Sequence, residues 1–121
     1  MTLLEICVDT PDGLAAAITG GADRIELCAA LSVGGITPSP AFIAAASRAP
    51  VPVFVMNRPR DGDFVYSAAE AEQMRADLRV IREAGGMVRG FVTGACREDG
   101  TLDRALLGGL MAGKGALRAT L

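Results

Sequence analysis

Short apolar runs alternate along the chain with segments that carry helix start and stop signals. Four of these runs are rich in β-forming residues and are bounded by glycine, proline or polar residues, a pattern typical of buried strands. The predicted strands are Leu3–Val8, Arg24–Cys28, Pro52–Met56 and Gly90–Thr93. Residues 116–121 are expected to begin a fifth strand.

The segments between these strands predict helices. Thr10–Pro11 predicts the start of a first helix and Gly20–Gly21 its end, because proline suits the first helical position and glycine the position after the last. Thr37–Pro38 predicts the start of a second helix in the same way. A Ser-x-x-Glu capping box at 67–70 begins a long third helix, and residues 102–113 predict a fourth.

A strand followed by a helix, repeated four times, indicates an α/β fold with a parallel sheet. Right-handed crossovers would place the helices outside a closing barrel or on both faces of an open sheet. No composition shift or low-complexity linker interrupts the order, so residues 1–121 are expected to form a single domain.

The two faces of the predicted strands differ in chemistry, since side chains alternate across a strand. One face is aliphatic, as with Leu4, Ile6 and Val8, and is expected to pack beneath helices. The other face is mixed and should point into a barrel lumen or crevice. It collects Glu5, Cys7, Arg24, Glu26, Cys28, Met56 and Arg58.

Charges on such a face cost several kcal/mol unless they are paired. One interpretation is a structural network in which Arg24 and Arg58 neutralise Glu5 and Glu26. The other is a ligand site at the carboxyl ends of the strands, where α/β proteins bind their ligands.

Sulfur atoms are the second chemical feature of the mixed face. Cys7 and Cys28 are expected at corresponding late positions on adjacent strands, which lie about 4.8 Å apart. Met56 adds a thioether on the next strand, and soft sulfur ligands suit Cu(I). The alternative is that both cysteines are small buried hydrophobes and that the methionine fills a gap in the core.

Two loops could contact an anion. Gly34, Gly35 and Thr37 precede a predicted helix start, where backbone N–H groups can cradle an anion; a plain tight turn is the alternative. Residues 58–66 form either a solvated loop or a lid that closes on a hinge at Gly62. No Walker sequence is present, and no Gly-x-Gly-x-x-Gly follows the first strand, so no nucleotide cofactor is expected.

Composition excludes several classes of function. A formal charge of −2 argues against nucleic-acid binding, and no apolar run is long enough to predict a membrane span. The absence of histidine removes Ser-His-Asp and Cys-His catalysis. Three cysteines without a CxxC pair argue against a disulfide framework and favour a location in the reducing cytoplasm. For Cys96 we expect only a structural or incidental role.

The runs LLEICVDTPDGLAAAITGGADRIELCAALSVGGITPS and VPVFVMNRPRDGDFVYS, followed by REDGTLD, resemble the CutC copper homeostasis family. The resemblance implies a cytoplasmic, copper-binding protein with a TIM-barrel-like fold. The chain is about half the family's length and lacks its His-Arg-Ala-Phe-Asp motif; Asn57 and the MVRG run also depart from its pattern. We therefore expect an N-terminal half-barrel, the first four βα units and the start of the fifth strand, left by truncation or a shortened gene.

Two functions are consistent with these residues. In a copper homeostasis protein, Cys7 and Cys28 would be Cu(I) thiolates and Met56 a weaker ligand. In a TIM-barrel enzyme or its relic, Arg58 and Arg60 would clamp a small anionic metabolite. The general base would be Glu5 or Glu26. The resemblance favours copper.

Assembly is the last expectation. Half of a barrel leaves one face of its sheet uncovered and two strand edges open, and open edges invite pairing with another chain. We expect a homodimer or a higher homo-oligomer.

Overall fold

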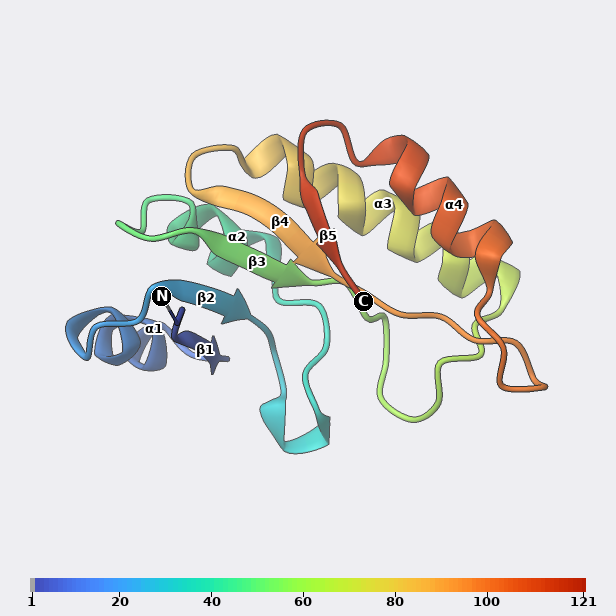
Figure 1. The fold of residues 1–121 in the computed structure, drawn as a ribbon, viewed down its shortest axis with the longest axis horizontal. Helices are drawn as coiled ribbons and strands as arrows, with labels where there is room; N and C mark the ends of the chain where they lie inside the picture. Colours follow the sequence, from blue (N-terminus) through green and yellow to red (C-terminus); the bar gives the residue numbers. More distant parts are fainter. Residues whose placement is uncertain (1) are drawn as a thin grey trace.

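The computed structural model describes residues 2–121, which form one curved sheet with helices along its outer side (Figure 1). The strands are β1 (Glu5–Val8), β2 (Arg24–Leu27), β3 (Val53–Met56), β4 (Val88–Val92) and β5 (Arg118–Thr120). The helices are α1 (Pro11–Thr19), α2 (Pro40–Ala46), α3 (Ala68–Ala84) and α4 (Arg104–Gly113), with a short 3-10 helix at Leu31–Val33. None of the helices within residues 2–121 combines the length and apolarity needed to cross a membrane.

The strands lie side by side in chain order, and every neighbouring pair is parallel. Each crossover between them carries a helix, the arrangement of a (β/α)8 barrel. The prediction of an α/β fold with about half of a TIM-barrel-like sheet is therefore confirmed. β1 and β5 lie at the two ends of this sheet (Figure 1).

The outer face of the sheet packs under the helices and forms the core. Its fully buried strand residues are Ile25, Leu27, Val53, Val55 and Phe91. Leu78 and Ile81 of α3 and Leu110 of α4 belong to the same cluster. The aliphatic strand face that the sequence predicts thus packs beneath helices in β2 and β3, and its burial provides most of the driving force for this fold.

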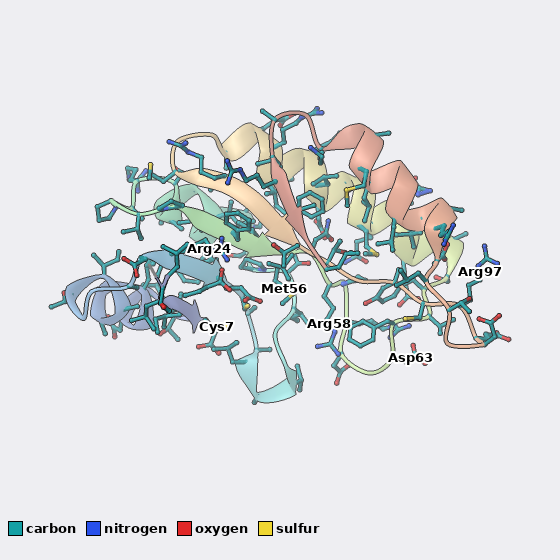
Figure 2. All side chains as sticks on the ribbon, in the orientation of Figure 1. Cys7, Arg24, Met56, Arg58, Asp63 and Arg97 are labelled. Carbon is teal, nitrogen blue, oxygen red and sulfur yellow. The ribbon has the colours of Figure 1, made fainter. Side chains whose placement is uncertain are left out.

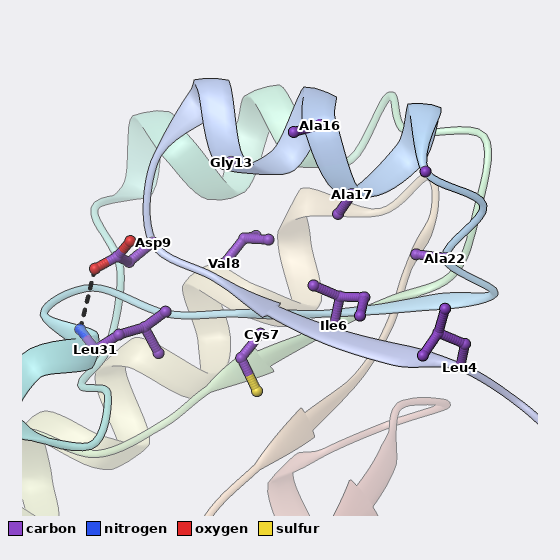
Figure 3. Close-up of a pocket in the computed structure, with 11 residues that line it drawn as sticks. Leu4, Ile6, Cys7, Val8, Asp9, Gly13, Ala16, Ala17, Ala22 and Leu31 are labelled. Carbon is purple, nitrogen blue, oxygen red and sulfur yellow. Dashed lines mark hydrogen bonds between the residues drawn. The ribbon is translucent and has the colours of Figure 1, made fainter.

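The first strand is covered less well than the others. Val8 is 4% exposed, whereas Leu4, just before β1, is 48% exposed. A cavity of about 390 Å³ lies between β1 and α1 (Figure 3), and α1 has no fully buried residue. The expected packing of Leu4 beneath a helix is wrong, because β1 is an end strand with no further helix on its far side.

Most of the predicted helix ends are confirmed. The Thr10 hydroxyl accepts a hydrogen bond from the Gly13 N–H at 2.9 Å and caps α1. Ser67 and Glu70 form the predicted capping box at the start of α3. In each case a side-chain oxygen satisfies a backbone N–H that the first turn of a helix leaves unpaired.

The predicted start of the second helix at Thr37–Pro38 is wrong. α2 begins at Pro40 and is capped by Ser39. The Thr37 hydroxyl instead accepts a hydrogen bond from the Arg58 N–H at 2.9 Å and lies 3.1 Å from the Arg58 carbonyl oxygen, to which it donates. Thr37 therefore joins the chain after β2 to the end of β3 and is unavailable as a cap.

One glycine in β4 is required by a close approach. A Cβ atom on Gly90 would lie 2.5 Å from a ring carbon of Phe54 and 2.7 Å from the carbonyl oxygen of Arg118. Gly90 is paired with Phe54 on one side and with Arg118 on the other. Because directly paired residues of parallel strands share a face, Phe54 and Arg118 lie on the same side of the sheet.

Candidate functional site

The mixed strand positions meet on the concave side of the sheet, which no helix within residues 2–121 covers. We call this surface the inner face and define it by Glu5, Cys7, Arg24, Glu26, Cys28, Phe54 and Met56. Figure 2 shows Cys7, Arg24 and Met56 on the strands and Arg58 beside the loops beyond the end of β3. The strand register thus brings Glu5, Cys7, Arg24, Glu26 and Met56 to one face, whereas Arg58, which the sequence placed with them, turns to the loops beyond the end of β3.

Half of the predicted charge network is present. Arg24 and Glu5 are register partners on β2 and β1, and the Arg24 Nε donates to the Glu5 carboxylate. The Arg24 guanidinium also lies over the Phe54 ring, 4.6 Å from its centroid. Phe54 was not among the residues that the sequence singled out, although its position on the mixed face of the third strand places it beside Arg24.

Glu26 is not neutralised by Arg58, so this part of the predicted network is wrong. Its carboxylate accepts a hydrogen bond from the Cys7 thiol, whose Sγ lies 3.4 Å from Glu26 Oε2. Burial raises the pKa of Glu26, and hydrogen bonding to the Glu5 carboxyl raises it further. The Cys7 thiol and Arg24 offset part of that rise. Glu26 is therefore a half-buried carboxyl with an elevated affinity for a proton.

The two cysteines of the inner face are offset by two residues along the strand direction. The register pairs Cys7 with Glu26, so Cys28 lies two residues beyond the position opposite Cys7. The expectation that the two cysteines occupy corresponding positions is therefore wrong by two residues. Both still lie on the inner face, because residues two apart in a strand point to the same side.

Cys28 and Met56 pack against the same glycine. A Cβ atom on Gly35 would lie 3.1 Å from the Cys28 Sγ and 3.6 Å from the Met56 Cε. Cys28 is only 1% exposed, whereas Cys7 is exposed. The loop after β2 thus folds back over the sulfur atoms of β2 and β3.

Both thiols of the inner face hold their protons tightly. Burial, with the nearby Glu26 as the next cause, raises the pKa of Cys7 to about 11. The same two causes raise the pKa of Cys28 to about 12. At neutral pH both thiols are protonated, so any ligand that binds their thiolates has to displace protons.

Arg58 fastens two loops to the end of β3. Its Nη1 donates to the carbonyl oxygens of Val33 at 2.9 Å and Gly35 at 3.0 Å, and its Nη2 donates to Gly62 at 2.9 Å. The guanidinium also lies 5.1 Å from the centroid of the Phe64 ring. This arginine binds backbone carbonyls and not the carboxylate that the sequence suggested.

Arg60 fastens the loop of residues 58–66 to α3. It forms ion pairs with Glu70 and with Asp63, donates to the Val65 carbonyl at 2.8 Å and lies over the Tyr66 ring. The carbonyl oxygen of the predicted hinge residue Gly62 itself accepts a hydrogen bond from Arg58. The loop is therefore held at both ends.

The N–H groups of the predicted anion cradle are already hydrogen-bonded to backbone carbonyls. Gly34 donates to Leu31, Gly35 to Ala30, and Thr37 to Arg58. α2 begins three residues beyond Thr37. In this conformation the loop is a tight turn that covers Cys28.

A second cavity lies at the carboxyl ends of β3, β4 and β5 and has a volume of about 310 Å³. Met56, Phe64, Thr93, Cys96 and Leu121 are among its lining residues. The carboxyl end of a parallel sheet is where α/β proteins bind ligands. Sequence reasoning gave Cys96 no partner; in the structure its N–H donates to the Phe64 carbonyl oxygen at 2.8 Å.

Within residues 2–121, no group of three or more cysteine and carboxylate side chains is arranged to hold a metal ion. The candidate donors on the inner face are two thiols and one thioether. That set is softer than the carboxylate-rich sites preferred by Mg²⁺ or Ca²⁺ and suits Cu(I).

This fold and inner face define half of a TIM-barrel-like protein with sulfur and carboxyl groups toward the lumen. The model of the CutC family matches residues 2–121, and the chain belongs to that family. A CutC family protein of Sinorhizobium medicae is 59% identical over 105 residues, which cover 87% of this chain and 42% of that protein.

Two further relatives agree with this assignment. The human protein named copper homeostasis protein cutC homolog is 49% identical over 111 residues, which cover 91% of this chain and 40% of the relative. A CutC crystal structure from Streptococcus agalactiae superposes with a TM-score of 0.90 at 30% identity, covering 98% of this chain and 58% of that one. The chain spans about half the length of the relatives it matches.

The raised pKa of Glu26 predicts a particular pH dependence of stability. A carboxyl whose pKa is higher in the folded state stabilises the fold below its unfolded pKa, and this contribution is lost as the pH rises through the folded pKa. Glu26→Gln keeps a neutral hydrogen-bond acceptor for Cys7. We expect the variant to gain stability relative to wild type as the pH rises from about 4 to 7, by no more than about 1 kcal/mol because water screens the site.

Urea unfolding of both proteins across this pH range measures the difference directly. Glu72→Gln is the matched control, since it removes the same charge from an exposed position on α3. A stability difference between Glu26→Gln and wild type that stays constant with pH would contradict the raised pKa.

Proposed function

We propose that this chain handles copper in the manner of the CutC family, with Cu(I) bound by the thiolates of Cys7 and Cys28 and more weakly by Met56. The observation that carries the proposal is the presence of sulfur side chains on one face of three adjacent strands. Thiolate and thioether ligands are those that Cu(I) prefers. Copper here is cargo and not a resident cofactor.

The surroundings of the sulfur atoms support this role. Cys28 and Met56 share contact with Gly35, whose lack of a side chain leaves room for both. Glu26, which accepts the Cys7 S–H hydrogen bond, is placed to relay the proton to water when the thiolate forms. Arg24 balances the neighbouring Glu5, so it limits the negative charge that a copper–thiolate group would face.

Two further observations support copper handling inside the cytoplasm. All three cysteines are free thiols, the state that a reducing compartment maintains. The human relative carries copper homeostasis in its name. We propose a cytoplasmic location on these grounds.

Anaerobic titration with Cu(I), against a chelator of known affinity, tests the proposal. We expect the double variant Cys7→Ser, Cys28→Ser to bind Cu(I) at least about a hundredfold more weakly than wild type, equivalent to roughly 2.8 kcal/mol. The reason is that serine hydroxyls are poor ligands for a soft cation.

Cys96→Ser is the matched control, because it removes one thiol that lies outside the inner face. The control should retain the wild-type affinity. Equal affinities in wild type and the double variant would reject the thiolate site.

A second function is favoured by the Glu5–Glu26 pair, whose raised Glu26 pKa suits general acid–base chemistry on a small anionic metabolite. The metabolite would have to compete for Arg58, which here binds three backbone carbonyls. Because the arginines are already engaged, copper is the function we place first.

Thermal unfolding with a panel of small dicarboxylates and phosphate esters tests this second function. A true ligand should raise the melting temperature in proportion to the logarithm of its concentration. The increase should disappear in Arg58→Gln and persist in Arg97→Gln, which alters an exposed arginine in the loop after β4. No stabilisation by any member of the panel, or equal stabilisation of both variants, would argue against it.

A further inference from the structure

The Cys28 thiol is covered by the loop that follows its own strand. We call residues 29–36 the glycine loop, because Gly34 and Gly35 lie on its returning side. Cys28 is only 1% exposed, and a Cβ atom on Gly35 would lie 3.1 Å from its Sγ. Cys7, on the same face of the sheet, is exposed. The glycine loop therefore covers one of the two thiols of the inner face and leaves the other open.

The base of the glycine loop is fixed by backbone hydrogen bonds. Ala29 and Ile36 exchange two of them, each 2.8 Å long, as in an antiparallel pair. Thr37, the next residue, exchanges hydrogen bonds with the backbone of Arg58 beyond the end of β3. The base is thus held independently of whatever holds the tip.

Two charged side chains from neighbouring strands hold the rest of the glycine loop. The Asp9 carboxylate, just after β1, accepts a hydrogen bond from the Leu31 N–H at 3.1 Å (Figure 3). On the other side, Arg58 donates to the carbonyl oxygens of Val33 at 2.9 Å and Gly35 at 3.0 Å. Charged partners make these hydrogen bonds stronger than bonds between neutral groups. The loop is therefore tied down from both flanking strands.

Apolar burial contributes little to holding the tip. Ser32, Val33 and Gly34 are exposed, and Val33 is 41% exposed although it is apolar. Ala30 has a φ of 50°, in the left-handed region that disfavours residues with a Cβ atom, so opening would release strain. Segments with few buried apolar contacts open at the lowest free energy. Closure of the glycine loop therefore depends on its polar tethers.

We propose that the glycine loop is a gate over Cys28 and Met56, and that Arg58 is the positioning residue that holds the gate shut. Opening breaks the Arg58 hydrogen bonds to the loop, while its bond to the Gly62 carbonyl oxygen can persist. Cys7 stays accessible in both positions of the loop. The consequence for copper rests on the proposed function: Cu(I) would meet Cys7 first and reach the other two sulfur atoms only when the loop opens.

Alkylation of the Cys28 thiol by iodoacetamide tests the gate without copper. The background Cys7→Ser, Cys96→Ser leaves Cys28 as the one thiol of the chain. We expect Arg58→Gln in this background to raise the alkylation rate at least about tenfold, because the rate follows the population of the open loop. Loss of the positive charge does not explain such an increase, since it would disfavour the thiolate that reacts.

Arg58→Lys separates the geometry of the tether from its charge. Lysine keeps the positive charge but lacks the planar fork that reaches Val33, Gly35 and Gly62 together, so this variant should also accelerate alkylation of Cys28. Arg97→Gln removes an exposed arginine from the loop after β4 and should leave the rate within about twofold of the background. Circular dichroism checks that each variant folds.

A second background, Cys28→Ser with Cys96→Ser, follows Cys7 alone and detects general loosening of the inner face. Arg58→Gln should leave the alkylation rate of Cys7 within about twofold. An unchanged Cys28 rate in Arg58→Gln, an equal rise in Arg97→Gln, or an equal acceleration of Cys7 would overturn the gate. Because no copper is present, these results are independent of the Cu(I) titration, and either proposal can fail alone.

Discussion

The alternation of side chains along parallel strands is the constraint on which the rest of this structure depends. One set of alternate positions is aliphatic and is buried beneath α2, α3 and α4. The other set has to face the concave side, whatever its chemistry, because a one-residue slip would bury charges and expose the core. Burial of Ile25, Leu27, Val53 and Val55 therefore also sets the positions of Glu26, Cys28 and Met56 on the inner face.

This constraint explains why the inner face was largely predictable and its detailed pairing was not. Strand faces and helix caps depend on local patterns, so the positions of Cys7, Glu26 and the Ser67 cap could be inferred from the sequence. The partners of Arg58 are backbone carbonyls of loops distant in sequence, and no residue pattern encodes them. The two-residue offset between Cys7 and Cys28 depends on strand register, which two apolar runs alone do not determine.

The predicted start of the second helix was wrong for a related reason. Thr37–Pro38 and Ser39–Pro40 are equivalent signals in the sequence, since each places a hydroxyl residue before a proline. The tertiary contact of Thr37 with Arg58 selects the second pair as the cap. The same contact joins the glycine loop, which packs against Cys28, to the end of β3.

On the inner face, burial and the neighbouring carboxyl groups raise the pKa values of the thiols. The pKa of about 11 for Cys7 and about 12 for Cys28 means that copper and protons compete for the same atoms. The most direct test is the pH dependence of Cu(I) affinity between about pH 6 and 8, corrected for protonation of the competing chelator. We predict an increase of about a hundredfold per pH unit for wild type, because two thiol protons are displaced, and of about tenfold for Cys7→Ser. An affinity independent of pH, or a slope unchanged by Cys7→Ser, would contradict thiolate binding by the inner face.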